Sequence, residues 1–226
     1  MNILIFGATG MVGQGALREA LLADDVKLVC TIGRNATGTQ HAKLSEVVHR
    51  DMHDFTAIEE DLKNFDACFF ALGVTSAGMN EADYTRITHD IAVAAGKTLA
   101  RLNPNMTFVF VSGASTDSTE QGKTMWARVK GKTENALRAM PFKAVYCFRP
   151  GFIQPMHGIR SRTRMYNILY SILAPLVLLL RAIAPRYVLT TESIGRAMLN
   201  AVRVGAPKAV LEAPDIYALS NAGGAR

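Results

Sequence analysis

The sequence is poor in the features that mark disulfide-rich, metal-binding and nucleic-acid-binding proteins. Its 226 residues include only three cysteines, Cys30, Cys68 and Cys147, which lie far apart in separate apolar stretches. An odd, scattered set of this kind forms neither a disulfide framework nor a CxxC metal site, so we expect no metal and a reducing, cytoplasmic location. The net charge of +6 is not gathered into any run of like charges, so nucleic acid is not an expected partner.

The sequence also lacks an apolar run long enough to span a bilayer, which takes about 20 residues. The best candidate is residues 168–180, and it is too short. We interpret it as a helix that is buried, lies at a membrane surface, or forms a homodimer. Arg160, Arg162 and Arg164 precede it and would face an anionic substrate, lipid phosphates or only solvent. The N-terminus has no charged region before its first apolar stretch, so it is not interpreted as a signal peptide.

What the sequence does have is a regular alternation of apolar runs and helical patterns, with 49% hydrophobic residues to supply a core. Short continuous apolar runs are typical of strands that helices cover on both faces. We predict strands at residues 2–6, 26–32, 45–50, 67–72, 107–111, 144–148 and 209–211. We predict helices at residues 11–23, 55–63, 81–101, 121–140 and 192–204, followed by a glycine-rich tail.

This order predicts an α/β fold with a Rossmann-like, doubly wound parallel sheet. Residues 1–150 would form the dinucleotide-binding domain. Residues 151–226 would form a small helical cap packed on the same domain.

A glycine-rich turn joins the first predicted strand to the first predicted helix. Its spacing, G-x-x-G-x-x-G, lets the backbone turn tightly and approach a pyrophosphate, which the free N–H groups at the start of the helix would bind. The residues assigned to this role are Gly7, Thr9, Gly10, Met11, Val12 and Gly13.

The end of the second predicted strand indicates which dinucleotide is bound. NAD-binding folds usually carry an acidic residue there, whereas this chain has Gly33 followed by Arg34. An arginine can pair with the 2′-phosphate of NADP(H), so we expect NADP(H) to be preferred over NAD(H). Asp51 and Met52, at the end of the third predicted strand, are candidates for the adenine site.

Together these motifs resemble the short-chain dehydrogenase/reductase superfamily in its extended and atypical branch. The turn GATGMVG, Gly33-Arg34, Asp51-Met52, Ala71-Leu72-Gly73 and Arg149-Pro150-Gly151 follow the expected order over residues 1–153. The pieces LGVT, VSGAS, RVKGKTEN and RYVLTTESIGRAM are similar to the subgroup of Tat-interacting-protein-like oxidoreductases. The resemblance implies an NAD(P)-dependent oxidoreductase. It adds four residues to the cofactor contacts: Leu72, Gly73, Pro150 and Gly151.

The resemblance also implies a proton relay, from which this chain departs. Such enzymes carry a serine after the fifth strand and a Tyr-x-x-x-Lys on the next helix, where the tyrosine transfers the proton and the lysine holds the nicotinamide ribose. Lys130 matches the lysine, but Trp126 stands at the tyrosine position. An indole N–H only donates hydrogen bonds and does not titrate near neutral pH. Either Ser112 or Ser115 would be the serine.

A second departure lies on the predicted helix 81–101, where the family often carries an asparagine and this chain offers Thr88 and His89. Other candidates to supply the proton are His157, Tyr166 and Tyr170. Three functions remain open. The first is an NADP(H)-dependent oxidoreductase acting on a small carbonyl or alcohol, the second a non-catalytic NADP(H)-binding regulatory or scaffold protein, and the third a sugar-nucleotide epimerase or dehydratase.

Overall fold

The computed structural model describes residues 1–159 and 185–222. The apolar segment predicted at 168–180, the arginines at positions 160, 162 and 164, and Tyr166 and Tyr170 lie outside the described residues.

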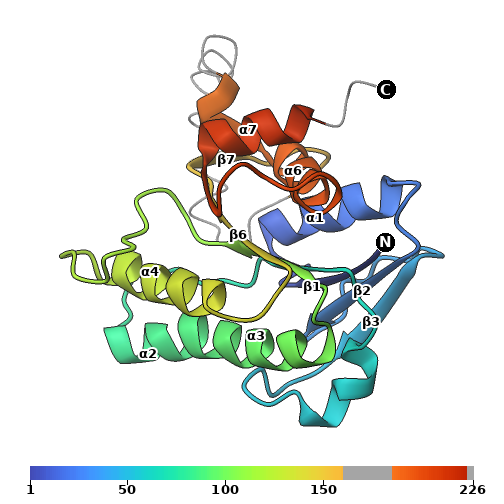
Figure 1. Cartoon of the computed structure of the whole chain (residues 1–226), viewed down its shortest axis with the longest axis horizontal. Coiled ribbons are helices and arrows are strands. Elements are labelled where there is room, and N and C mark those ends of the chain that lie inside the picture. The colour runs from blue at the N-terminus through green and yellow to red at the C-terminus, as the bar shows by residue number, and fades with distance from the viewer. Residues whose placement is uncertain (160–184, 223–226) are drawn as a thin grey trace.

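A seven-stranded sheet with all neighbouring strands parallel forms the centre of the described chain (Figure 1). Its spatial order is β3-β2-β1-β4-β5-β6-β9, so the chain winds outward from β1 in both directions. The strands are β1 (Asn2–Phe6), β2 (Leu28–Gly33), β3 (Leu44–Val48), β4 (Ala67–Phe70), β5 (Thr107–Val111), β6 (Ala144–Arg149) and β9 (Val210–Glu212). This arrangement confirms the predicted Rossmann-like, doubly wound fold.

Helices cover both faces of the sheet. On one face lie α1 (Met11–Leu22), α6 (Thr191–Arg203) and α7 (Ala213–Asn221). On the other lie the 3₁₀ helix η1 (Thr56–Leu62), α2 (Glu81–Thr85), the π-helix η2 (Arg86–Asp90), α3 (Ile91–Leu102) and α4 (Met125–Arg138).

The two faces have separate apolar cores because successive strand residues point to opposite sides of a sheet. In β1, Ile3 and Ile5 belong to the core under α1 and α6, whereas Leu4 and Phe6 belong to the core under α3. All four side chains are fully buried. The apolar run that predicted this strand therefore supplies both cores at once.

Helix α1 is covered by α6, which lies near the other end of the chain. The two helices approach so closely that a Cβ added to Gly15 of α1 would lie 2.4 Å from the carbonyl oxygen of Thr191. A Cβ added to Gly195 of α6 would lie 2.8 Å from the Cγ of Glu19 on α1. Small residues at the crossing thus bring the two backbones together.

The end of the chain is more regular than the sequence predicted. Instead of running on as a glycine-rich tail, residues 213–221 form α7, with Pro214 in its first turn. The helix begins with a capping box, in which the Glu212 N–H donates to Asp215 Oδ2 at 2.9 Å. Two further strands that were not predicted, β7 (Phe152–Gln154) and β8 (Val188–Thr190), pair in parallel as a separate small sheet, and the short 3₁₀ helix η3 (Pro185–Tyr187) precedes β8.

Two predicted helices differ in detail. The helix predicted at 81–101 contains the π-turn η2, which separates α2 from α3. The helix predicted at 121–140 begins only at Met125, because Asp117 holds the preceding residues in a loop by accepting a hydrogen bond from the Gly122 N–H at 2.6 Å.

Candidate functional site

A cleft of about 960 Å³ lies along the carboxyl ends of β1, β2, β3 and β4. This is the edge at which doubly wound proteins bind their ligands. The predicted residues that line it are Gly7, Thr9, Gly10, Arg34, Asp51, Met52, Leu72 and Gly73. The structure therefore brings together segments that are far apart in the sequence.

The glycine turn forms the floor of this cleft. Gly7 has φ +79°, a conformation that residues with a side chain rarely adopt, and a Cβ there would lie 2.6 Å from the Leu72 backbone nitrogen. Gly10 precedes α1 and provides no side chain to cap it. Only glycine thus allows the turn to pack against the end of β4 and leave the start of α1 open.

The first N–H groups of α1 are free to bind an anion. Within the described residues, the backbone N–H groups of Met11, Val12 and Gly13 have no hydrogen-bond acceptor. Such groups carry a partial positive charge and suit a phosphate. Gly13 has a second role, since a Cβ there would lie 2.1 Å from the Gly7 carbonyl oxygen. These features fit the pyrophosphate of a dinucleotide.

The outer end of the cleft is basic. Arg34 and Arg50 are both exposed and line it, together with Asp51. Sequence reasoning missed Arg50, although it directly precedes Asp51. It also missed Glu46 of β3, whose Oε2 accepts hydrogen bonds from the Thr37 N–H at 2.7 Å and the Thr31 hydroxyl at 3.1 Å. Glu46 thereby fixes the loop that carries Arg34.

The candidate reacting groups lie in the loop after β5 and on α4, and none of the four side chains lines the cleft. Trp126 and Lys130 are one helical turn apart and face the same backbone: a Cβ added to Gly113 would lie 3.9 Å from Trp126 Cζ3 and 4.0 Å from Lys130 Nζ. Lys130 Nζ donates a hydrogen bond to the Ser112 carbonyl oxygen. Burial lowers the pKa of this ammonium to about 8, although the nearby Glu134 carboxylate acts in the opposite direction.

The two candidate serines have different surroundings. Ser112 is buried, and its hydroxyl lies 2.5 Å from Glu134 Oε1 and 3.1 Å from the Phe148 carbonyl oxygen. Ser115 is exposed and has φ +66°, a conformation uncommon for a residue with a side chain. The Ser112 hydroxyl is therefore used inside the fold, whereas the Ser115 hydroxyl is open to a ligand.

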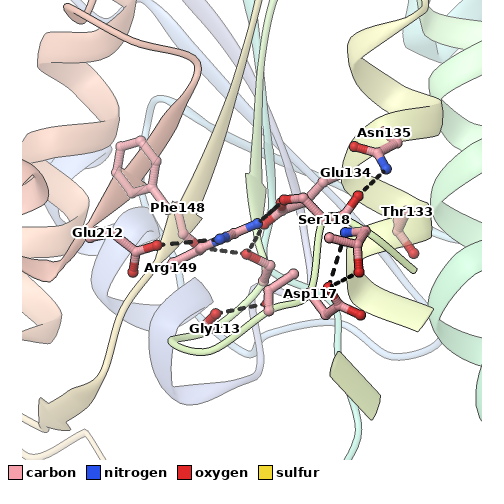
Figure 2. A network of polar contacts seen from close by, with 12 residues as sticks. Gly113, Asp117, Ser118, Thr133, Glu134, Asn135, Phe148, Arg149 and Glu212 are labelled. Carbon is pink, nitrogen blue, oxygen red and sulfur yellow. Dashed lines mark hydrogen bonds and ion pairs between the residues drawn. The ribbon is translucent and has the colours of Figure 1, made fainter. Parts of the chain in front are cut away.

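The Ser112 hydroxyl donates to one member of a buried ion pair that sequence reasoning missed, Glu134 and Arg149 (Figure 2). Glu134 has no exposed surface, and it accepts hydrogen bonds from Arg149 Nε at 3.0 Å and from Nη2 at 2.5 Å. Arg149 also lies 2.5 Å from the Ser118 hydroxyl and 3.3 Å from Glu212. The pair raises the pKa of Arg149 further above its ordinary value. The available signal was an acid four residues after Lys130.

Other predicted residues lie beside these groups or apart from them. The Pro150 carbonyl oxygen accepts a hydrogen bond from the Ala114 N–H at 3.0 Å, and a Cβ on Gly151 would lie 3.9 Å from the Ala114 Cβ. Both residues therefore support the loop after β5. His157 lines a second cavity of about 700 Å³ against α1, which adjoins the cleft at Thr9 and Thr37, and its Nε2 lies 2.9 Å from Glu192 Oε2.

On the helix of residues 81–102, Thr88 is buried in the π-turn, and His89 Nδ1 lies 2.8 Å from Asp90. Neither side chain of this pair of candidates lines the cleft.

In the ranges 1–159 and 185–222, no helix is long and apolar enough to cross a bilayer. The same ranges contain no group of histidine, cysteine, aspartate and glutamate side chains arranged to hold a metal ion.

The model of the NAD-dependent epimerase/dehydratase family matches residues 3–131. Among curated proteins, the chain is 33% identical over 171 residues to the mitochondrial protein fmp52-1 of Aspergillus terreus, covering 72% of this chain and 70% of the relative. It is 30% identical over 168 residues to the mitochondrial protein FMP52 of Saccharomyces cerevisiae, covering 73% of this chain and 69% of that relative.

Solved structures share the fold at low sequence identity. MoeE5 in complex with UDP-glucuronic acid and NAD superposes with a TM-score of 0.68 and 16% identity, over 94% of this chain and 76% of that protein. An oxidoreductase of the short-chain dehydrogenase/reductase family from Burkholderia thailandensis superposes with a TM-score of 0.65 and 15% identity, over 96% and 92%.

The curated relatives correct one expectation. They are named as mitochondrial proteins, so the cytoplasmic location predicted from the sequence is wrong. The prediction depended on the three scattered cysteines, all of which are free and buried in the structure. Unpaired cysteines separate reducing from oxidising compartments and carry no information about which reducing compartment is used.

Proposed function

Because the chain belongs to the NAD-dependent epimerase/dehydratase family, within the extended and atypical short-chain dehydrogenases/reductases, we propose that it binds a nicotinamide dinucleotide and acts as an oxidoreductase on a carbonyl or alcohol. The observation that carries the proposal is the glycine turn: it lies in a cleft of about 960 Å³ and leaves the first N–H groups of α1 without acceptors.

The cofactor would lie across the carboxyl ends of the strands. The N–H groups of Met11, Val12 and Gly13 would hold its pyrophosphate. Arg34, supported by Arg50, would pair with the 2′-phosphate of NADP(H), which an acidic residue at this position would repel. When bound, the nicotinamide supplies or accepts a hydride.

At the reacting end, Lys130 would hold the hydroxyls of the nicotinamide ribose. Trp126 would present its ring to the nicotinamide or the substrate, and its N–H would donate to a carbonyl oxygen. The exposed Ser115 hydroxyl would donate to the same oxygen. This arrangement orients a carbonyl without the tyrosine on which epimerases and dehydratases of sugar nucleotides also depend.

The same tryptophan favours one alternative, a regulatory protein whose conformation follows NADP(H) binding without turnover. Both functions require the dinucleotide, so binding is tested first and turnover second.

Trp126 is the only tryptophan, so its emission reports binding at this site. We expect quenching and energy transfer on addition of NADPH, with a lower Kd than for NADH. Arg34→Ser should raise the Kd for NADPH about ten- to a hundredfold, the effect of one charged hydrogen bond, and leave that for NADH unchanged. Arg138→Ser, an exposed position on α4 away from the cleft, is the matched control.

Equal losses of affinity for NADPH and NADH in Arg34→Ser would contradict the role of Arg34. If the wild-type protein bound neither dinucleotide, the proposed function itself would be contradicted. A panel of aldehydes, ketones and quinones then tests turnover. NADPH binding without any turnover would favour the regulatory alternative.

A further inference from the structure

Lys130 is a half-buried cation without a carboxylate partner among the described residues. Glu134 lies four residues later on the same helix, the spacing at which lysine and glutamate usually pair. Both carboxylate oxygens of Glu134 are instead taken by Arg149, and Oε1 also by the Ser112 hydroxyl. The partner that Lys130 does have is the Ser112 carbonyl oxygen, which is neutral.

An ammonium in these surroundings releases its proton easily. Taking it out of water penalises the charged form, and a neutral carbonyl returns only part of that loss. The pKa of about 8 follows from this burial, and Glu134 raises it only partly. A proton donor works best when its pKa is near the working pH.

Several ionisable groups on the other elements packed against α4 are paired or are neutral because of burial, and on η2 the His89 ring is paired with Asp90. On the helix of residues 81–102, Glu81 is paired with Arg128 at 2.6 Å, and burial raises the pKa of the Tyr84 phenol. On β6, Arg149 is paired with Glu134, and burial raises the pKa of the Cys147 thiol. Glu134 is therefore the charged group that raises the pKa of Lys130. Its carboxylate is held by the ion pair with Arg149.

The position of Lys130 also fits a proton donor. Gly113 leaves the space next to the ammonium without a side chain, since a Cβ there would lie 4.0 Å from Nζ. The neighbouring aromatic, Trp126, has no proton to give near neutral pH.

We propose that Lys130 Nζ itself gives the proton in carbonyl reduction and takes it in alcohol oxidation, and that Arg149 is the positioning residue that keeps Glu134 away from it. This inference rests on the oxidoreductase function proposed above. Once the carbonyl carbon has gained a hydride, its oxygen holds the electron pair of the former π bond. A Lys130 N–H bond breaks and its proton bonds to that oxygen. The neutral amine regains a proton from water, and oxidation runs in reverse.

The first test uses the cofactor-free protein and needs no turnover. Trace labelling with isotopic acetic anhydride between pH 6 and 11, read by mass spectrometry, gives the titration midpoint of the Lys130 amine. The exposed Lys132 on the same helix is the internal reference for reagent reactivity. We expect a midpoint near pH 8 for Lys130. A midpoint at or above pH 10 would overturn the proposal.

Variants of the ion pair test the role of Arg149. In Arg149→Gln, the freed Glu134 carboxylate should pair with Lys130 and raise the titration midpoint of the Lys130 amine by one pH unit or more. In Arg149→Lys, a cation is kept beside Glu134, so the midpoint should return to the wild-type value. The double variant Glu134→Gln/Arg149→Gln removes both buried charges and should return the midpoint to the original value or below. It also keeps the test usable if Arg149→Gln alone does not fold. A midpoint that is the same in all variants would overturn the role of Arg149.

The second test is the pH profile of kcat/KM for NADPH-dependent reduction of a carbonyl substrate from the panel. The rate should fall above pH 8, because the amine is then deprotonated, and this limb should follow the labelling midpoint upward in Arg149→Gln. Lys130→Met should lose at least about a hundredfold in rate. Turnover that survives in Lys130→Met would overturn only the proton role of Lys130, whereas no turnover with NADPH bound would overturn the oxidoreductase function as well.

Discussion

Replacing Lys130 by methionine should change the pH dependence of the free energy of unfolding by a defined amount. The pKa of Lys130 is about 8 in the folded protein, against the ordinary lysine value of 10.5. Below pH 8 the amine is charged in both the folded and the unfolded chain, and the fold bears the full cost of burying it. At about 1.4 kcal/mol for each pH unit between the two values, that cost is about 3 kcal/mol. Solvent reaches part of the residue, which reduces the expected value to about 2–3 kcal/mol.

As the pH rises from 8 to 10.5, the folded protein loses this proton before the unfolded chain does. The cost therefore disappears, and the wild-type protein gains stability relative to Lys130→Met. Methionine has a similar unbranched shape, and the Ser112 carbonyl that loses its donor contributes equally at every pH. Groups that titrate in both proteins cancel in the difference.

The assay is urea unfolding of both proteins, without cofactor, at pH 7 and pH 10.5. The difference in unfolding free energy between wild type and Lys130→Met should shift by about 2–3 kcal/mol in favour of the wild type at the higher pH. Lys132→Met, at an exposed position on the same helix, should stay within about 0.5 kcal/mol of the wild type at both pH values. A difference for Lys130→Met that does not change with pH would refute the reasoning.

Two further predictions concern packing and buried hydrogen bonds. Gly15→Ala places a methyl group 2.4 Å from the Thr191 carbonyl oxygen, so we expect a loss of about 1–3 kcal/mol in urea unfolding. In the control Gly73→Ala, the added Cβ meets no atom within 4 Å, so the free energy of unfolding should hardly change. Equal losses of unfolding free energy in the two variants would contradict the close approach of α1 and α6. Asn103→Ala leaves the Phe65 N–H and the Leu62 carbonyl without their buried partners and should cost about 2–3 kcal/mol. Hydrogen exchange of the Phe65 amide should accelerate. An unchanged exchange rate would show that its hydrogen bond to Asn103 does not stabilise the fold.

The sheet and the cofactor cleft were predictable because their signals are local. The apolar run 107–111 corresponds residue for residue to β5. Arg34, Asp51 and Gly73 each follow a strand, and in a parallel sheet the carboxyl ends of the strands meet at one edge. Strand order therefore converts positions far apart in the sequence into one cleft.

Features that depend on contacts between distant segments were not predictable. Glu134 lies on a helix rich in polar residues, so the sequence pattern predicts an exposed side chain. In the structure it is fully buried and paired with Arg149 of the next strand. The π-turn at 86–90 keeps the residue types of an ordinary helix, so the pattern of apolar positions does not reveal it. The N-cap of helix α7 is Glu212, which is not among the residues that commonly cap helices, so the residues after β9 were predicted to be a tail.

The packing of α6 on α1 has a consequence for the protein while the ribosome is still making it. The first helix is complete after residue 22, but the helix that covers its apolar face begins only at Thr191. Through most of synthesis, Ala16 and Ala20 lack the cover that buries them in the finished fold. Contacts so distant in the chain also form slowly. The apolar face of α1 therefore stays without its α6 cover until residues 191–203 have been made, and exposed apolar surface of this kind favours aggregation of an incomplete chain.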